Sequence, residues 1–294
     1  MSTSSLQDLL GDLERRYPRS TAQEWDAVGL IAGDPQQPVR RVLCAVEATE
    51  ATAREAVEIG ADLLLVHHPL LLRGVTSIAE TTAKGRILTT LVRAGVALYA
   101  AHTNADDAPG GVSASLAEAV GMVDVEPLVP ATHPDAAAGA GTGRVGRLAE
   151  PVTLTAFARR VAEVLPATTQ GIRVAGDGDA LVERVAVCGG SGDSYLAVAR
   201  DSGADVYLTA DLRHHPATDF RAAGSGRSSW TPRTGRASGC GCHRSPISCG
   251  RTPRRGALRW RSTSPPRAPM PGPTSPCRNL CPSTPPEHPL EHPA

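Results

Sequence analysis

The stretch Ala61-Asp-Leu-Leu-Leu-Val-His-His-Pro-Leu-Leu-Leu72 decides how this chain folds. Its apolar run is short, follows Gly60 and is stopped by Pro69, a pattern typical of a strand buried on both faces of a parallel sheet. The strand delivers two adjacent imidazoles, His67 and His68. Because open α/β sheets place their sites at the carboxyl ends of strands, this pair is the first candidate site.

The segments on either side of this strand predict an alternation of helices and strands. A second apolar strand, 96–101, ends just before His102 and Asp106. Apolar periodicity and capping residues predict the remaining elements. Helices are expected at 5–16, 50–59, 82–94, 113–120 and 153–165, and further strands at 39–46 and 171–175. This order favours an α/β fold.

The chain also repeats part of its own pattern. Val39-x-Arg41-Val42 and Gly60-Ala61-Asp62 recur, 143 positions later, as Val182-x-Arg184-Val185 and Gly203-Ala204-Asp205. The shared spacing predicts internally duplicated β-α-β units that form two α/β domains. The alternative is that right-handed β-α-β units resemble one another by chance. We expect a first α/β region at 1–130, a linker rich in Ala and Gly at 131–146 and a second α/β region at 147–220.

Composition separates the last part of the chain, 221–294, from the rest. Residues 1–220 carry 18 Lys and Arg against 28 Asp and Glu, whereas 221–294 carry 12 Arg against two Glu. This tail holds five of the seven cysteines, so Cys44 and Cys188 alone imply no disulfide framework. A net charge of zero argues against a general nucleic-acid binder. Neither a membrane span nor a leader is recognisable, so we expect a cytoplasmic protein without a membrane partner.

Two strand ends together predict a metal site. His67 and His68 follow one strand, while His102 and Asp106 follow the other. Neutral imidazoles with a carboxylate suit Zn, Mn, Fe or Ni, and Asp106 is a candidate bridge between two metal ions. The alternative is a set of ordinary core or surface histidines.

Two further residues near these motifs are weighed in the same way. Trp25 is expected to pack in the core rather than stack on a substrate. Glu47 is expected to be a solvated turn residue rather than to line the site.

Five motifs resemble the NGG-interacting-factor-like family of dinuclear metal-centre proteins. They cover 1–220 in the family's order. They are Trp25-Asp-x-Val-Gly-Leu30 with Gly33-Asp34, His67-His-Pro69, His102-Thr-Asn-x-Asp106 with Pro109-Gly-Gly111, Gly143-Arg-Val-Gly146, and Val187-Cys-Gly-Gly-Ser-Gly192. The resemblance implies two divalent metal ions held by His67, His68, His102 and Asp106, and a homohexameric ring of chains with two α/β domains each. The short 131–146 connection is similar to the form that lacks an extra inserted domain.

The resemblance also implies a further His and Glu, four residues apart, near the C-terminus. No histidine of the tail has an acidic residue four positions later. A reading frame shifted by one base does permit such a pair: from Trp230-Thr231 it permits Asp-Ala-Ala-His-Trp-Ala-Ser-Glu. Beyond Arg255 it permits the strand-like Ala-Val-Glu-Val-Tyr-Val-Ser. We therefore interpret 221–294 as frameshifted, in the gene or in its sequencing, and expect the tail as written to be disordered.

Two functions remain open on the sequence. Bacterial members of this family are labelled GTP cyclohydrolase 1 type 2 homologues, which implies a metal-dependent hydrolase that opens the imidazole ring of GTP with loss of formate. The residues do not select GTP, because no guanine-reading motif is present, and the same hydrolytic chemistry suits another heterocycle or a phosphoester. The alternative is a non-catalytic metal-binding scaffold that binds a partner. With four of six ligands, we expect metal to be held more weakly than in an intact homologue.

Overall fold

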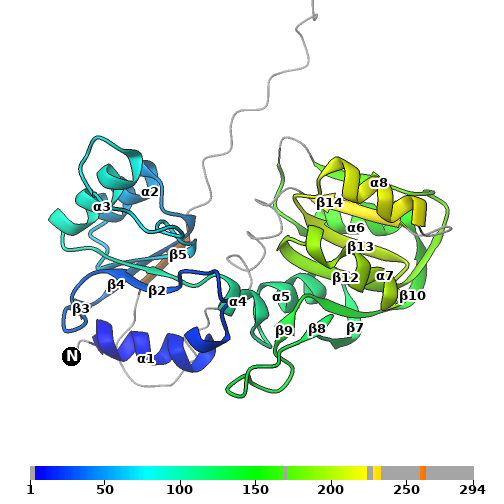
Figure 1. Ribbon diagram of the computed structural model, residues 1–294, viewed down its shortest axis with the longest axis horizontal. Coiled ribbons are helices and arrows are strands. Elements are labelled where there is room, and N and C mark those ends of the chain that lie inside the picture. Colours follow the sequence, from blue (N-terminus) through cyan, green and yellow to red (C-terminus); the bar gives the residue numbers. More distant parts are fainter. Residues whose placement is uncertain (1–3, 169–170, 224–227, 233–258, 263–294) are drawn as a thin grey trace, which may run out of the picture. The chain divides into compact units, whose positions relative to one another are not determined.

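The computed structural model describes residues 4–168, 171–223, 228–232 and 259–262. Two mixed sheets form its framework (Figure 1). The first sheet has the order β15-β4-β5-β6-β2. Its strands are β2 (Gly29–Ala32), β4 (Arg41–Glu47), β5 (Leu63–His68), β6 (Ala97–Ala100) and β15 (Arg259–Ser262). All neighbours pair in parallel except β2, which runs antiparallel to β6.

Strand β5 is buried on both faces, as its unbroken apolar run predicts. Leu63 and Leu65 pack with the leucines of α1 (Leu6–Arg16), while Leu64 and Val66 pack with α2 (Glu50–Glu58) and α3 (Ala83–Arg93). The sheet is thus the middle of three layers, with α1 on one face and α2 and α3 on the other (Figure 1). Helices cover both faces of β5, and only its carboxyl end, at His68, is partly exposed.

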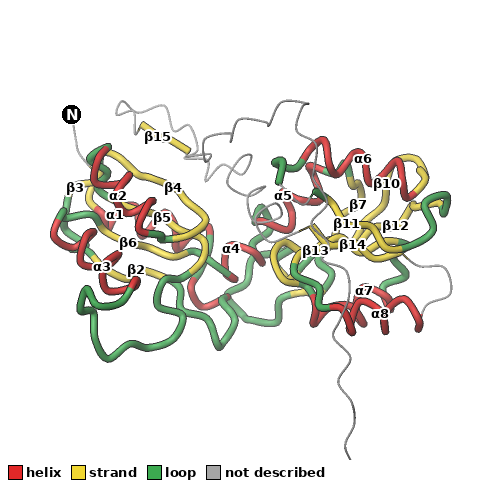
Figure 2. Tube along the Cα trace, turned by 90° about the horizontal axis from the view of Figure 1, so that it is seen from above, coloured by secondary structure: helices red, strands yellow, loops and turns green. Residues whose placement is uncertain are grey.

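The second sheet has the order β11-β14-β13-β12-β10-β7. Helices cover both of its faces: α6 packs on one, and α7 and α8 pack on the other (Figure 2). The strands are β7 (Met122–Glu126), β10 (Arg144–Thr153), β11 (Ile172–Ala175), β12 (Leu181–Ser191), β13 (Val206–Ala210) and β14 (Ser228–Pro232). The helices are α5 (Val112–Ala119), α6 (Leu154–Val164), α7 (Leu196–Asp201) and α8 (His214–Ala223).

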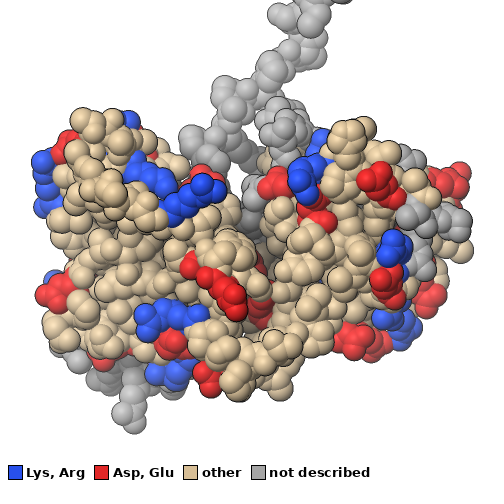
Figure 3. Space-filling model, viewed as in Figure 1, with Lys and Arg blue, Asp and Glu red and all other residues tan. Residues whose placement is uncertain are grey.

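Short elements complete the described chain. They are β1 (Ser4–Ser5), β3 (Pro38–Val39), β8 (Val129–Pro130), β9 (Gly141–Thr142), α4 (Thr103–Asp107), and the 3₁₀ turns η1 (Arg19–Thr21) and η2 (Asp193–Tyr195). None of the described helices is long and apolar enough to cross a membrane. On the face drawn in Figure 3, acidic and basic side chains are interspersed.

The repeat seen in the sequence has the same hydrogen bonds in both sheets. In the first, an Asp62 carboxylate oxygen accepts from the backbone N–H groups of Arg40 and Arg41, at 2.7 and 2.8 Å. In the second, Asp205 accepts from Glu183 and Arg184 at 3.0 and 2.8 Å. The strand registers also correspond, because Val42 faces Leu63 and Val185 faces Val206. The two segments, 143 positions apart, thus share one hydrogen-bonding pattern within a mixed α/β fold.

One expectation needs correction. The segment 131–146 is not a linker throughout, since β9 lies within it and β10 begins at Arg144. Of the tail 221–294, the structure describes the end of α8, to Ala223, and the strands β14 and β15, which pair with β13 and β4. An open sheet edge offers unpaired backbone groups to any extended segment, whatever its side chains. The rest of the tail prediction, on 224–227, 233–258 and 263–294, lies outside the described residues.

Candidate metal centre

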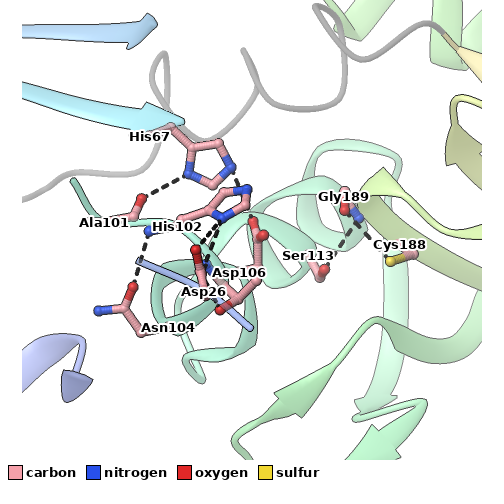
Figure 4. A network of polar contacts seen from close by, with 10 residues as sticks. Asp26, His67, Ala101, His102, Asn104, Asp106, Ser113, Cys188 and Gly189 are labelled. Atoms are coloured by element: carbon pink, nitrogen blue, oxygen red, sulfur yellow. Dashed lines mark hydrogen bonds and ion pairs between the residues drawn. The ribbon is translucent and has the colours of Figure 1, made fainter. Parts of the chain in front are cut away.

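The candidate site lies where two parallel strands end side by side. His67 and His68 are the last residues of β5, and His102 follows β6 after Ala101. The two strands pair in parallel up to Val66 and Ala100, so their carboxyl ends reach the same edge of the sheet. Residue 102 then caps α4, which carries Asp106 back toward His67 (Figure 4). The fold therefore brings together residues that are about 40 positions apart in the chain.

The three imidazoles form one cluster. Ring centroids lie 5.1 Å apart for His67 and His68, 5.0 Å for His67 and His102, and 5.6 Å for His68 and His102. One ligand nitrogen from each ring lies within 4.8 Å of the other two. Asp106 joins the edge of this cluster, with its Oδ1 atom 3.5 Å from His67 Nε2. All four residues singled out in the sequence are thus neighbours.

Each imidazole is oriented by an oxygen at its Nδ1 atom. His67 Nδ1 lies 2.9 Å from the carbonyl oxygen of Ala101, and His68 Nδ1 lies 3.1 Å from Glu47 Oε1. His102 Nδ1 lies 3.0 Å from each carboxylate oxygen of Asp26. Carbonyl and carboxylate oxygens accept hydrogen bonds, so these contacts assign the proton to Nδ1 in all three rings. Each Nε2 then carries the lone pair that a metal requires.

Asp26 is the best-anchored of these oxygen donors. Its Oδ2 atom also accepts hydrogen bonds from the backbone N–H of Thr103 at 3.0 Å and from the Thr103 hydroxyl at 2.5 Å. Burial opposes ionisation of this carboxyl, but the hydrogen bonds from His102 and Thr103 outweigh it and lower the pKa of Asp26 well below its ordinary range. Asp26 is therefore a fixed negative charge behind His102.

The opposite electrostatic situation holds at Asp106. Burial, reinforced by the negative charges of Asp107 and Asp26, raises the pKa of its carboxyl well above the ordinary value. Its buried Oδ1 atom has no hydrogen-bond partner among the residues that the structure describes. A buried polar atom without a partner is costly, and a cation at this place would satisfy it. The donor set thus fits a metal ion.

His67 is prepared for the same role. Burial, together with the positive charges that His102 and His68 can carry, lowers the pKa of His67 to about 3. The ring is therefore neutral at physiological pH and needs to lose no proton before it binds a metal. Three neutral imidazole nitrogens and one carboxylate are a donor set that Zn, Fe, Mn and Ni accept. The cluster could bind a metal ion, and the geometry does not select which one.

Sequence reasoning misjudged two residues at this site. Trp25 does not pack in the core: 60% of it is exposed, and its ring contacts that of His102 edge-on, with centroids 5.9 Å apart. Glu47 is exposed, as expected of a turn residue, yet it orients His68. Asp26 was noted only as part of a motif. A carboxylate preceding an irregular segment gives no periodic signal, so its partner 76 positions away could not be identified.

Comparisons with known proteins agree with this description. The model of the family Duf34/NIF3 (NGG1p interacting factor 3) matches residues 4–227. A Streptomyces coelicolor protein named GTP cyclohydrolase 1 type 2 homolog is 51% identical over 217 residues, covering 74% of this chain and 76% of that protein. A Mycobacterium tuberculosis protein of the same name is 35% identical over 317 residues, covering 73% and 83%.

Solved structures share the fold. The Bacillus cereus protein related to NIF3 superposes with a TM-score of 0.75 at 26% identity, covering 82% of this chain and 91% of that one. A Staphylococcus aureus hypothetical protein gives a TM-score of 0.72 at 27% identity, covering 81% and 88%. Each alignment covers more than four-fifths of this chain, so the likeness is not confined to one motif.

Proposed function

The chain belongs to the Duf34/NIF3 family, and from this premise we propose that it is a metal-dependent hydrolase centred on His67, His68, His102 and Asp106. The observation that carries the proposal is the convergence of one ligand nitrogen from each of three imidazoles, within 4.8 Å of one another, beside Asp106 Oδ1. That buried oxygen has no hydrogen-bond partner among the described residues. Groups in this state are arranged for a cation rather than for one another.

The residues of the chain have distinct parts in this proposal. His67, His68 and His102 would donate their Nε2 atoms, while Ala101, Glu47 and Asp26 hold the three rings in the required tautomer. Asp106 would supply the negatively charged ligand and, if two ions bind, the bridge between them. Bound metal ions would lower the pKa of a coordinated water and polarise a substrate oxygen, which is hydrolytic chemistry.

The substrate class follows from the relatives and is part of the proposal. Proteins named GTP cyclohydrolase 1 type 2 homolog are 51% and 35% identical to this chain. Hydrolytic opening of a heterocycle such as the guanine imidazole ring, or hydrolysis of a phosphoester, is therefore the reaction to test first.

Metal content and turnover test the proposal together. Purified protein is reconstituted with Zn, Mn, Fe or Ni, analysed for bound metal, and assayed on GTP and on phosphoesters. We expect His68→Ala to lose metal and activity, while His133→Ala, which removes an exposed histidine outside the cluster, should change neither. Wild-type protein with no more metal than His68→Ala would refute the site.

The second candidate function is a metal-binding scaffold that does not catalyse. It is favoured if wild-type protein holds metal but shows no turnover above His68→Ala on any of these substrates.

We propose that in either case the chain forms a homohexamer, as its family resemblance implies. Light scattering on the purified protein measures the mass directly, and a monomer would contradict the ring.

A further inference from the structure

Trp25 is the side chain beside the cluster that the metal centre does not use. An indole is among the largest apolar groups that a chain can bury, yet 60% of Trp25 is exposed. Its one described ring contact is with His102, at a centroid separation of 5.9 Å and an interplanar angle of 79°. Most of the indole therefore remains free at the margin of the site.

Polar residues on both sides of Trp25 anchor its segment of the chain. Asp26, the next residue, binds the ring of His102 and the backbone and hydroxyl of Thr103. Gln23, two residues earlier, donates its N–H to the Thr103 hydroxyl at 3.0 Å and its amide to Asp107 at 3.2 Å. The chain on both sides of the indole is thus tied to α4 and to His102, while the indole itself is exposed.

We propose that Trp25 is a stacking platform for a planar heteroaromatic ring, which it holds against the metal centre. This inference rests on the proposed function and names the part of the substrate that the chain itself recognises. An indole offers a π face on which any flat ring can stack. Because the indole contacts His102, a ligand ring stacked on it would lie next to the histidine cluster. A substrate of this class carries the bond to be hydrolysed in or beside its ring.

A second copy of the chain is the competing occupant. Protein interfaces surround an aromatic anchor with further apolar contacts and are poor in Glu. Here the neighbours of Trp25 in the chain are Glu24, which is exposed, and Asp26, which is engaged with His102 and Thr103. With an acidic residue on either side of it in the chain, Trp25 fits a small planar ligand better than a protein surface.

The fluorescence of Trp25 alone can report whether a ring stacks on it. The chain has three tryptophans, Trp25, Trp230 and Trp260, so a Trp230→Phe and Trp260→Phe background leaves only Trp25 to emit. Guanosine is the probe, and ribose 5-phosphate, which lacks the ring, is its control. We expect saturable quenching by guanosine and none by ribose 5-phosphate, with and without added metal. No response to guanosine in either state would overturn the proposal.

Calorimetry on variants with all tryptophans otherwise intact supplies the second measurement. Loss of one stacked base contact costs about 1–3 kcal/mol, so Trp25→Ala should bind guanosine about 5- to 150-fold more weakly, and Trp25→Phe should retain most of the affinity. Both variants should keep the wild-type metal content, which separates this proposal from that of the metal centre. Equal affinity in Trp25→Ala, or a changed oligomeric mass with unchanged guanosine binding, would contradict the platform.

Discussion

Asp26 determines how His102 presents its lone pair. Its two oxygens lie 3.0 Å from His102 Nδ1, while Thr103 holds the carboxylate in place. Asp26→Asn can present an N–H to the ring instead of an oxygen, which would favour the wrong tautomer. Because losing such an outer partner costs 10- to 100-fold in metal affinity, we expect a loss of about that size. Metal titration with a competing chelator measures it.

The control for this variant is Asp12→Asn, which alters an exposed carboxylate on α1 that pairs with Arg15. It should bind metal as the wild type does. If Asp26→Asn retained full affinity while its circular dichroism and thermal unfolding were unchanged, the orienting role of Asp26 would be wrong.

The sequence predicts the histidines of this site but not the residues that orient them. His67, His68 and His102 could be found because apolar strands end at them, and strand ends of a parallel sheet share an edge. Asp26, Glu47 and the exposure of Trp25 could not, because all three depend on tertiary contacts made from loops or a strand terminus. Local pattern carries no information about such partners.

Cys188 lies in β12 of the second sheet, and its reactivity tests whether its thiol is buried there. Burial, reinforced by the negative charge of Asp106, raises the pKa of its thiol to about 12. The reactive species is the thiolate, so the folded protein should not be alkylated at this position near pH 8.5, about where a free thiol is half ionised. Peptide mapping after iodoacetamide treatment detects the modification. Rapid labelling of native Cys188, at the rate found in concentrated guanidinium chloride, would contradict the buried placement.

At the level of strands and helices, the duplicated β-α-β units share one stabilising device. The carboxylates of Asp62 and Asp205 each accept two backbone N–H groups from the preceding strand or the residue before it. The backbone N–H of each aspartate in turn donates to a carbonyl oxygen of that strand, on Arg41 or Arg184, at 2.8 Å. Replacing either by Ala leaves two backbone donors without their acceptor. Since hydrogen bonds to charged groups contribute about 1.5–3 kcal/mol, we expect a loss of at least that order for each variant.

Thermal unfolding measures the loss. For a chain of this size, about 1 kcal/mol corresponds to about 2–4 °C in Tm, so each variant should melt several degrees below the wild type. Asp201→Ala removes a carboxylate that is exposed and paired with its neighbour Arg200, and it should melt as the wild type does. A large effect at Asp62 with none at Asp205 would show that the two units are not equivalent in energy.

The prediction of a linker at 131–146 was wrong for a reason that also lies in these elements. Helices and strands with clear periodicity were predicted to within about two residues, as is usual for such boundaries. The 131–146 segment was not, because its Ala and Gly content predicts a linker although β10 begins at Arg144. Arg144 is in fact buried, with its guanidinium donating to the carbonyl oxygens of Gly141, Gly143 and Ala108 at 2.6 to 2.7 Å. A buried arginine satisfied by carbonyls looks like a surface residue in the sequence.

Across the full chain, the family match and the change in composition nearly coincide. The family model ends at residue 227, shortly after the acidic part of the chain gives way to the arginine-rich tail. The alignment with the Streptomyces protein covers 76% of that relative, so about a quarter of its length has no matched counterpart here. The strand permitted by the shifted reading frame beyond Arg255 also overlaps the position of β15, Arg259–Ser262. These three observations support the proposal that the tail is a shifted reading of the family's own C-terminal segment.

The metal content of two chains tests this proposal. One chain keeps the tail as written, and the other is read in the shifted frame from Trp230, which restores a His and a Glu four residues apart. Four ligands should hold one ion, or two loosely, whereas the restored pair should raise the content toward two ions per chain, because each added ligand increases affinity. Metal analysis after dialysis against a chelator gives the stoichiometry. Two tightly held ions in the chain as written would contradict the weaker metal binding, and an uninterrupted frame on resequencing the gene would refute the shifted reading.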